Sequence, residues 1–219
     1  MNVEVEELYD YGALRALAAP TMLVVRCAEP TFVLGGSQSI EVLKEPERDQ
    51  VALRRRRGGG GVVVLQPDDV WLDWWIPAGD ERWSPDVHAM SRHVGEWWRA
   101  ALASRLHGEV ALHEGPMTGD PASRVACFAA RGPGEVMVDG RKAVGVTQWR
   151  VREGVFLSTV LHARASSILL DVLTHVPQGL AAALEHHTLV TLDLDGDDLT
   201  LELIERSAPV EVRQLLLIA

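Results

Sequence analysis

The alternation of apolar and polar residues predicts several short strands along the chain. Residues 22–34 contain two apolar segments around a Glu-Pro turn, and residues 61–77 contain two more around the sequence Gln-Pro-Asp-Asp. Residues 134–151 predict a hairpin, because Asp139 and Gly140 favour the left-handed backbone angles of a two-residue turn. These segments predict that the chain builds a β-sheet.

A helical repeat lies between the second and third of these regions. Apolar residues recur at helical spacing from Val87 to Leu102. Ser84 is predicted to cap this helix, Pro85 suits its first turn, and Asp86 faces the positive end of the helix dipole. The spacing therefore predicts an amphipathic helix that packs on the sheet.

The remaining segments complete an α/β pattern. Six of the seven tryptophans lie within residues 71–98, which predicts a tryptophan-rich core and not a cofactor site. Residues 163–176 and 177–187 are predicted to be helical. Residues 193–198, "DLDGDD", are predicted to be a turn, because the glycine is misplaced for a calcium loop. The fold class is therefore α/β (α+β), a mostly antiparallel mixed sheet flanked by helices.

Composition and cysteine usage limit the class of protein. Of the 219 residues, 47% are hydrophobic and 24% are charged, which is typical of a globular domain. Cys27 and Cys127 are far apart, and neither they nor the eight histidines show metal-ligand spacing. We therefore expect reduced thiols, a cytoplasmic location and no metal site. No apolar run approaches the roughly 20 residues of a membrane span, so no membrane association is expected.

One basic cluster stands out in this acidic chain. Arg54–Arg57 and Gly58–Gly61 form the sequence "RRRRGGGG" in a protein of net charge −10. An acidic body argues against nucleic-acid binding, and the apolar strand that follows argues against a flexible linker. Guanidinium groups beside exposed backbone N–H groups suit a pocket for a small anion. A glycine bulge at a sheet edge with solvated arginines is the alternative.

Three segments together resemble a known family. They are "EPTFVLGGSQ" (29–38), "RRRRGGGGV" (54–62) and "GEVMVDGRKAVGVTQWR" (134–150). Their order and separation resemble those of the lipoate-protein ligase A family and its octanoyltransferase relatives, which share the biotin/lipoate ligase catalytic domain. The resemblance covers about residues 5–165. It implies a single catalytic domain over residues 1–219, with residues 165–219 as a divergent C-terminal part.

The resemblance also implies a set of site residues. In this family the glycine loop wraps an acyl tail or acyl-adenylate, and the hairpin lysine touches the activated carbonyl and phosphate. Lys142 stands at that lysine position, where its positive charge would stabilise the oxyanion of acyl transfer. Without the resemblance, an exposed hairpin lysine is the simpler interpretation. The expected substrate-binding residues are Arg54, Arg55, Gly58, Gly59, Gly60, Gly145 and Gln148.

Cys127 is the second candidate catalytic residue. It precedes Lys142 by fifteen residues in the sequence "ACFAARGPGEVMVDGRK". This resembles the cysteine-dependent octanoyltransferases, in which a thiolate carries the acyl group as a thioester. A neighbouring ammonium group would favour such a thiolate. The alternative is an ordinary core cysteine beside Phe128.

Two departures from the family pattern leave the acyl substrate open. The family commonly has a histidine after the glycine loop, where this chain has Val64 or Leu65. It also tends to have a His-Gly pair after the hairpin, about where Thr159 and Val160 stand. The chain is also too short for the C-terminal accessory domain of many single-chain ligases. That length favours an acyltransferase, or a ligase whose second part is another chain.

Three functions therefore remain. The first is attachment of an octanoyl or lipoyl group to a lysine of a lipoyl-domain protein, through Cys127 or through an ATP-derived acyl-adenylate. The second is a related ligase for another carboxylic acid, and the third is a non-catalytic member that binds an acyl or nucleotide ligand. The expected partners are the lipoyl-domain acceptor and, on the transferase route, an acyl carrier protein as donor.

Overall fold

Two β-sheets form the framework of the protein. The computed structural model describes residues 5–45, 51–118, 124–191 and 194–217. The larger sheet contains, in spatial order, β10 (Glu211–Leu217), β1 (Thr21–Cys27), β5 (Val70–Pro77), β9 (Gly154–Leu161), β8 (Arg141–Val151), β7 (Val136–Val138) and β6 (Val110–Leu112). The smaller sheet contains β3 (Ala52–Arg55), β2 (Thr31–Leu34) and β4 (Val63–Leu65). Only the β1–β10 and β2–β3 pairs are parallel, so the prediction of a mostly antiparallel mixed sheet is confirmed.

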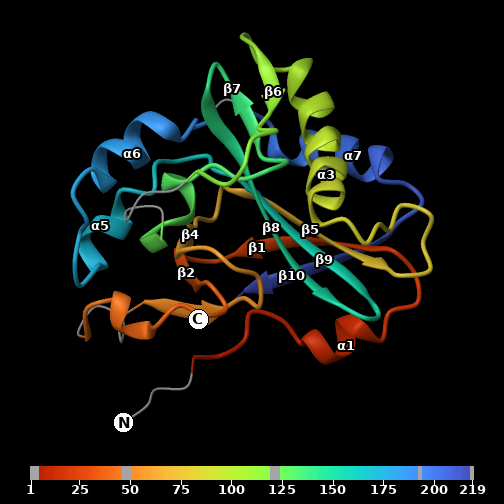
Figure 1. Ribbon diagram of the computed structural model, residues 1–219, viewed down its shortest axis with the longest axis horizontal. Helices are drawn as coiled ribbons and strands as arrows, with labels where there is room; N and C mark the ends of the chain where they lie inside the picture. Colours follow the sequence, from red (N-terminus) through yellow and green to blue (C-terminus); the bar gives the residue numbers. More distant parts are fainter. Residues whose placement is uncertain (1–4, 46–50, 119–123, 192–193, 218–219) are drawn as a thin grey trace.

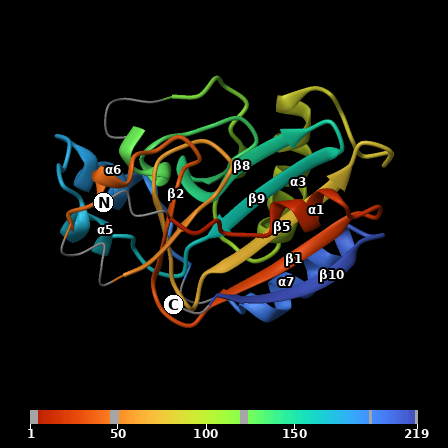
Figure 2. The same ribbon diagram turned by 90° about the horizontal axis from the view of Figure 1, so that it is seen from below.

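Helices cover both faces of the larger sheet (Figure 1). They are α1 (Tyr11–Arg15), α3 (Val87–Ala103), α5 (Ile168–Val172), α6 (Leu180–His187) and α7 (Gly196–Arg206), with 3₁₀ turns η1 (Ile40–Val42) and η2 (Cys127–Ala129). Figure 2 shows α3 and α7 behind the sheet and α1 in front of it. None of the helices among the described residues is long and apolar enough to cross a membrane.

Alternate side chains of each central strand enter two separate cores. On β5, Trp74 packs with Trp98 of α3 on one face, and Trp75 packs with Phe156 of β9 on the other. Trp74, Trp75 and Trp98 are fully buried, which confirms the predicted tryptophan-rich core. The Trp98 indole donates a hydrogen bond of 2.9 Å to Thr159 Oγ1, so its polar atom is satisfied inside the core.

Helix bounds differ from the sequence prediction at several places. The helix predicted over 163–176 is limited to α5 (Ile168–Val172), and α6 begins at Leu180, three residues after the predicted start at 177. The cap of α3 is Asp86, whose carboxylate accepts hydrogen bonds from the backbone N–H groups of His88 and Ala89. Ser84 instead accepts a hydrogen bond from Asp86 N, so the predicted cap was two residues too early. The turn predicted at "DLDGDD" is also wrong over its described residues. Asp195 caps α7 there, because its carboxylate accepts from the first amides of the helix.

The four strands predicted around the Glu-Pro and Gln-Pro-Asp-Asp turns are present. The two strands at each turn do not pair with each other, so neither turn forms a hairpin. β1 and β5 belong to the larger sheet, whereas β2 and β4 belong to the smaller one. The chain therefore crosses from one sheet to the other at each turn. By contrast, the hairpin of β7 and β8 turns at Asp139 and Gly140, as predicted, and both residues have positive φ.

Candidate functional site

The largest described cavity, of about 660 Å³, lies beside the glycine loop. This volume is in the usual range for small-molecule sites. Its wall combines residues from the glycine loop, from the start of α3, from the segment around η2 and from β8. They are Ser37, Gly59, Gly60, Gly61, Val87, His88, Ser91, Met117, Arg124, Cys127, Ala130, Arg131, Gly132, Pro133, Glu135, Val146, Thr147 and Gln148.

Backbone contacts hold the glycine loop against the segment that carries Cys127. Val62 N donates to Val125 O at 2.8 Å, and Cys127 N donates to Val62 O at 3.0 Å. A methyl group at Gly61 would lie 2.4 Å from Val125 O, so only glycine permits this approach. Gly60 has φ +92°, a left-handed angle that glycine adopts without strain. The glycines therefore place Cys127 on the cavity wall, beside the loop.

Arg56 supports the glycine loop from the inside. Its side chain is buried, and its guanidinium donates to Gly59 O at 2.7 Å, Gly61 O at 2.8 Å and Val33 O at 3.0 Å. Burial lowers the pKa of Arg56, and the neighbouring Cys127 partly opposes that effect. A fork of fixed N–H groups is well suited to bind several carbonyl groups at once. Arg56 is therefore a structural part of the loop.

The other arginines of the cluster face away from this cavity. Arg54 lies 3.5 Å from a carboxylate oxygen of Glu6, and Arg55 donates to Gly35 O at 3.0 Å and Gln38 O at 2.6 Å. Arg57 forms two hydrogen bonds with Glu7. Arg54 and Arg55, expected to line the pocket, are thus placed outside its described wall. Four consecutive arginines gave no signal that Arg56 would be the inward one.

Gly58 and Gly145, two more expected substrate-binding residues, line smaller voids. Gly58 borders a void of about 10 Å³ and Gly145 one of about 20 Å³, and Arg56 lines both voids. A methyl group at Gly145 would lie 3.0 Å from ring atoms of Phe128, so glycine lets that ring pack against β8. Cys127 lines the larger of these voids as well as the main cavity, so it separates the two spaces.

Gln148 connects β8 to the start of α3 and lines the main cavity. Its amide nitrogen lies 2.8 Å from Val87 O and 2.8 Å from Ser91 Oγ. These contacts fix one side of the cavity mouth. Gln148, Gly59, Gly60 and Cys127 are therefore the expected site residues that the structure brings together on one wall.

Lys142 lies directly behind that wall. It is 1% exposed, so the alternative of a solvent-exposed hairpin lysine is wrong. Its Nζ lies 2.6 Å from Glu135 Oε1 and donates to the backbone oxygens of Cys127 at 3.0 Å and Ala130 at 3.1 Å. Burial raises the pKa of Glu135, and the positive charge of Lys142 opposes that rise. Sequence reasoning missed Glu135, although it lies seven residues before Lys142 in the quoted hairpin motif.

A buried carboxylate lies beneath the void of about 20 Å³ that Cys127 also lines. Asp73 accepts hydrogen bonds from the Tyr9 hydroxyl at 2.6 Å, the Trp71 indole at 2.6 Å and Thr159 N at 3.1 Å. Burial of the group raises the pKa of Asp73 to about 7, against the effect of these hydrogen bonds. Trp71 and Thr159 also line the void, so this network forms its floor.

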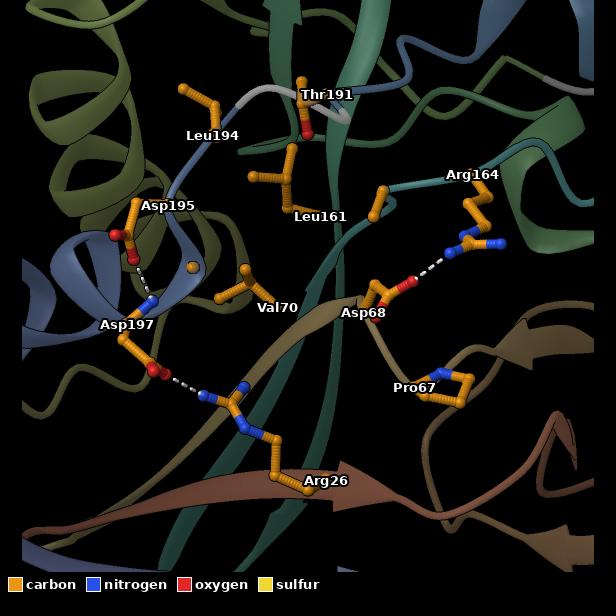
Figure 3. A pocket seen from close by; sticks show the side chains of 12 residues that line it. Arg26, Pro67, Asp68, Val70, Leu161, Arg164, Thr191, Leu194, Asp195 and Asp197 are labelled. Atoms are coloured by element: carbon orange, nitrogen blue, oxygen red, sulfur yellow. Dashed lines mark hydrogen bonds and ion pairs between the residues drawn. The ribbon is translucent and has the colours of Figure 1, made fainter.

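A second cavity, of about 460 Å³, has a different character (Figure 3). Arg26 pairs with Asp197 at 2.7 Å, and Arg164 pairs with Asp68 at 2.5 Å. The carboxylate of Asp195 in the same wall caps α7. Both arginines of this cavity therefore pair with carboxylates of the same cavity.

Solved structures with the same architecture are lipoate-protein ligases. Lipoate-protein ligase A bound with ATP has a TM-score of 0.71 and 17% identity, with 100% of this chain and 90% of that chain covered. A putative lipoate protein ligase from T. acidophilum with bound lipoic acid has a TM-score of 0.70 and 16% identity, covering 99% and 90%. This chain has the lipoate-protein ligase fold. The fold implied by the sequence resemblance is therefore confirmed.

A third similar structure comes from an archaeal lipoylation system. It is the bi-partite lipoate protein ligase and its E2 lipoyl domain from Thermoplasma acidophilum, with a TM-score of 0.70, 16% identity and coverage of 96% and 80%. No family model and no curated protein matches the sequence. Within the described part of this lipoate-ligase fold, no cluster of His, Cys, Asp and Glu is arranged to hold a metal ion.

Proposed function

We propose that the protein belongs to the lipoate-protein ligase family and attaches a lipoyl or octanoyl group to a lysine of a lipoyl-domain protein. One observation carries the proposal: in a lipoate-ligase fold, the glycine loop and Cys127 form one wall of a cavity of about 660 Å³. The neighbours that hold ATP, lipoic acid or a lipoyl domain support the same ligand classes for this chain.

Cys127 supports a thioester route. Its sulfur attacks the acyl carbonyl of a thioester donor, the donor's carbon–sulfur bond breaks, and the carrier leaves as a thiol with the proton that Cys127 gives up. The acceptor lysine amine then attacks the Cys127 thioester, and the amine proton returns to the sulfur. Because Cys127 is partly exposed on the cavity wall, the thiol is reachable by such a donor.

Arg124 and Arg131 support an ATP-dependent route. Both lie on the wall of the cavity, where guanidinium groups suit phosphate oxygens. On this route the lipoate carboxylate attacks the α-phosphate of ATP and pyrophosphate leaves. The acceptor lysine then attacks the acyl-adenylate and releases AMP. Octanoyl transfer and lipoate ligation therefore share a site and an acceptor but differ in the acyl donor.

Intact-mass measurement separates the two routes. We expect wild-type protein incubated with octanoyl-carrier protein, without acceptor, to gain one octanoyl group. Cys27→Ala, which removes the other cysteine in β1, should gain it as well, whereas Cys127→Ala should not. Transfer from lipoate and ATP to an apo lipoyl domain that survives Cys127→Ala, with no adduct, would instead establish the adenylate route. A protein that binds these ligands but supports neither transfer would be the non-catalytic alternative.

Lys142 is proposed to be required on either route. Removing a group that stabilises developing charge typically slows a reaction about a hundredfold or more. We expect Lys142→Ala to lower the rate of transfer to the apo lipoyl domain by that factor, whereas Lys44→Ala, at a half-buried lysine outside the cavity wall, leaves it unchanged. A folded Lys142→Ala protein with full transfer activity would exclude the role.

A further inference from the structure

The Lys142 ammonium has no donor left for a ligand in this arrangement. It has three N–H groups, and its three oxygen contacts are Glu135 Oε1 and the backbone oxygens of Cys127 and Ala130. The Phe128 ring covers it, with its centroid 4.6 Å from Nζ. Any ligand oxygen that binds Lys142 must therefore replace one of these three partners.

Glu135 is the partner that a ligand meets first. Glu135 is one of the residues that line the cavity, whereas Lys142 is not part of the described wall. The Cys127 and Ala130 oxygens belong to the backbone of η2 and its cap, which the contact with Val62 holds in place. The Glu135 contact comes from a side chain, which can change rotamer, although its carboxylate also accepts from Gly132 N at 2.8 Å and from Val146 N at 3.4 Å. It is the movable contact.

The charges around the cavity set up a conflict for an anionic ligand. Arg124 and Arg131 face the cavity from the segment around η2, and His88 faces it from α3. The two arginines attract a carboxylate or phosphate, but an ionised Glu135 repels it at the point nearest to Lys142. Like charges in contact inside a protein are strongly unfavourable. The conflict disappears when Glu135 takes up a proton.

We propose that Glu135 is a displaceable counter-ion of Lys142 and that the anionic group of the acyl donor takes its place. On binding, the ligand anion replaces the Glu135 carboxylate on Lys142, and Glu135 accepts one proton from solvent. This inference rests on the proposed function, because it assigns the ligand to the same cavity. Glu135 is then a positioning residue: it holds Lys142 in place in the unliganded protein and couples ligand binding to proton uptake.

Calorimetric titration of the full-length protein with lipoate tests this coupling. Titrations at one pH in buffers with different ionisation enthalpies count the protons taken up. Wild-type protein should take up close to one proton per lipoate in the alkaline range, and its affinity should fall by up to about tenfold for each pH unit. Glu135→Gln should take up none, bind lipoate about tenfold or more tightly, and lose the pH dependence. The variants His88→Gln and Cys127→Ala, which remove the other titratable groups named on this wall, should keep the wild-type coupling.

A second variant covers the case in which Glu135→Gln fails to fold with an unpaired Lys142. The double variant Glu135→Gln/Lys142→Met removes both charges and should bind lipoate weakly, without proton uptake. Equal proton uptake in wild type and either Glu135 variant would overturn the counter-ion role alone. If neither wild type nor any variant binds lipoate, lipoate ligation is excluded and the counter-ion role fails with it, whereas octanoyl transfer is decided separately by the mass measurement with octanoyl-carrier protein.

Discussion

Replacement of Asp73 by asparagine should remove a pH-dependent destabilisation of the fold. The Asp73 carboxyl is fully buried, and burial raises its pKa from 3.8 to about 7. One pKa unit corresponds to about 1.4 kcal/mol, so the shift corresponds to about 4 kcal/mol between the two protonation states. The folded protein holds a proton that the unfolded chain releases, so this group's contribution to stability is complete below about pH 4 and is lost as pH rises to about 7.

Urea denaturation at several pH values measures this effect. Asparagine has nearly the same shape, so its amide can keep partners at the positions of Tyr9, Trp71 and Thr159. We expect Asp73→Asn to match wild type near pH 4 and to exceed it by up to about 4 kcal/mol at pH 8. Asp86→Asn keeps an N-cap acceptor but removes the carboxylate charge, whose pKa the helix amides lower, so it should show the opposite trend and lose stability at neutral pH. Parallel curves for wild type and Asp73→Asn would refute the reasoning.

Two further substitutions test the glycine loop by the same denaturation assay. Gly61→Ala should destabilise the protein by more than about 1 kcal/mol, because the methyl group would lie 2.4 Å from Val125 O. Gly59→Ala, where a methyl group meets nothing within 4 Å, should be neutral or slightly stabilising, and equal effects would exclude a tight approach at Gly61. Arg56→Lys should cost about 2 kcal/mol or more, since one ammonium cannot reach all the bound carbonyls. Arg57→Lys should cost under about 1 kcal/mol, as an exposed ion pair does, and a similar cost at both positions would show that burial of Arg56 is not decisive.

Local signals in the sequence located most of the secondary structure but not the pairing of distant segments. Asp139 and Gly140 predicted their turn because the required backbone angles depend on those two residues alone. The separation of β1 and β2 into different sheets depends on partners far along the chain, such as β5 and β4. Helix caps were partly predictable. Ser84 and Asp86 are both favourable N-cap residues, and the sequence does not tell which of them caps α3; in the structure it is Asp86.

Sequence motifs indicated where the candidate site lies. They did not indicate which charged residues are buried and paired beside it. The glycine loop, Cys127 and Gln148 meet on one cavity wall, and their roles in binding or catalysis stay predictions. The carbonyl groups around Arg56 determine that it is the buried arginine. Four identical side chains in a row give no indication of which one is buried. The pairing of Lys142 with Glu135 depends likewise on the bulge between β7 and β8, which tertiary contacts determine.

The arginine–glycine cluster therefore has a physical role different from a simple basic patch. Arg56 binds the carbonyl oxygens of Gly59 and Gly61, so it draws these two oxygens toward the protein interior. In a trans peptide the N–H points opposite to the C=O, so the N–H of Gly60 points away from Arg56. Gly60 lies on the cavity wall. A buried cation thus orients backbone dipoles of the loop from the interior, although Arg56 itself is not part of the described wall of the main cavity.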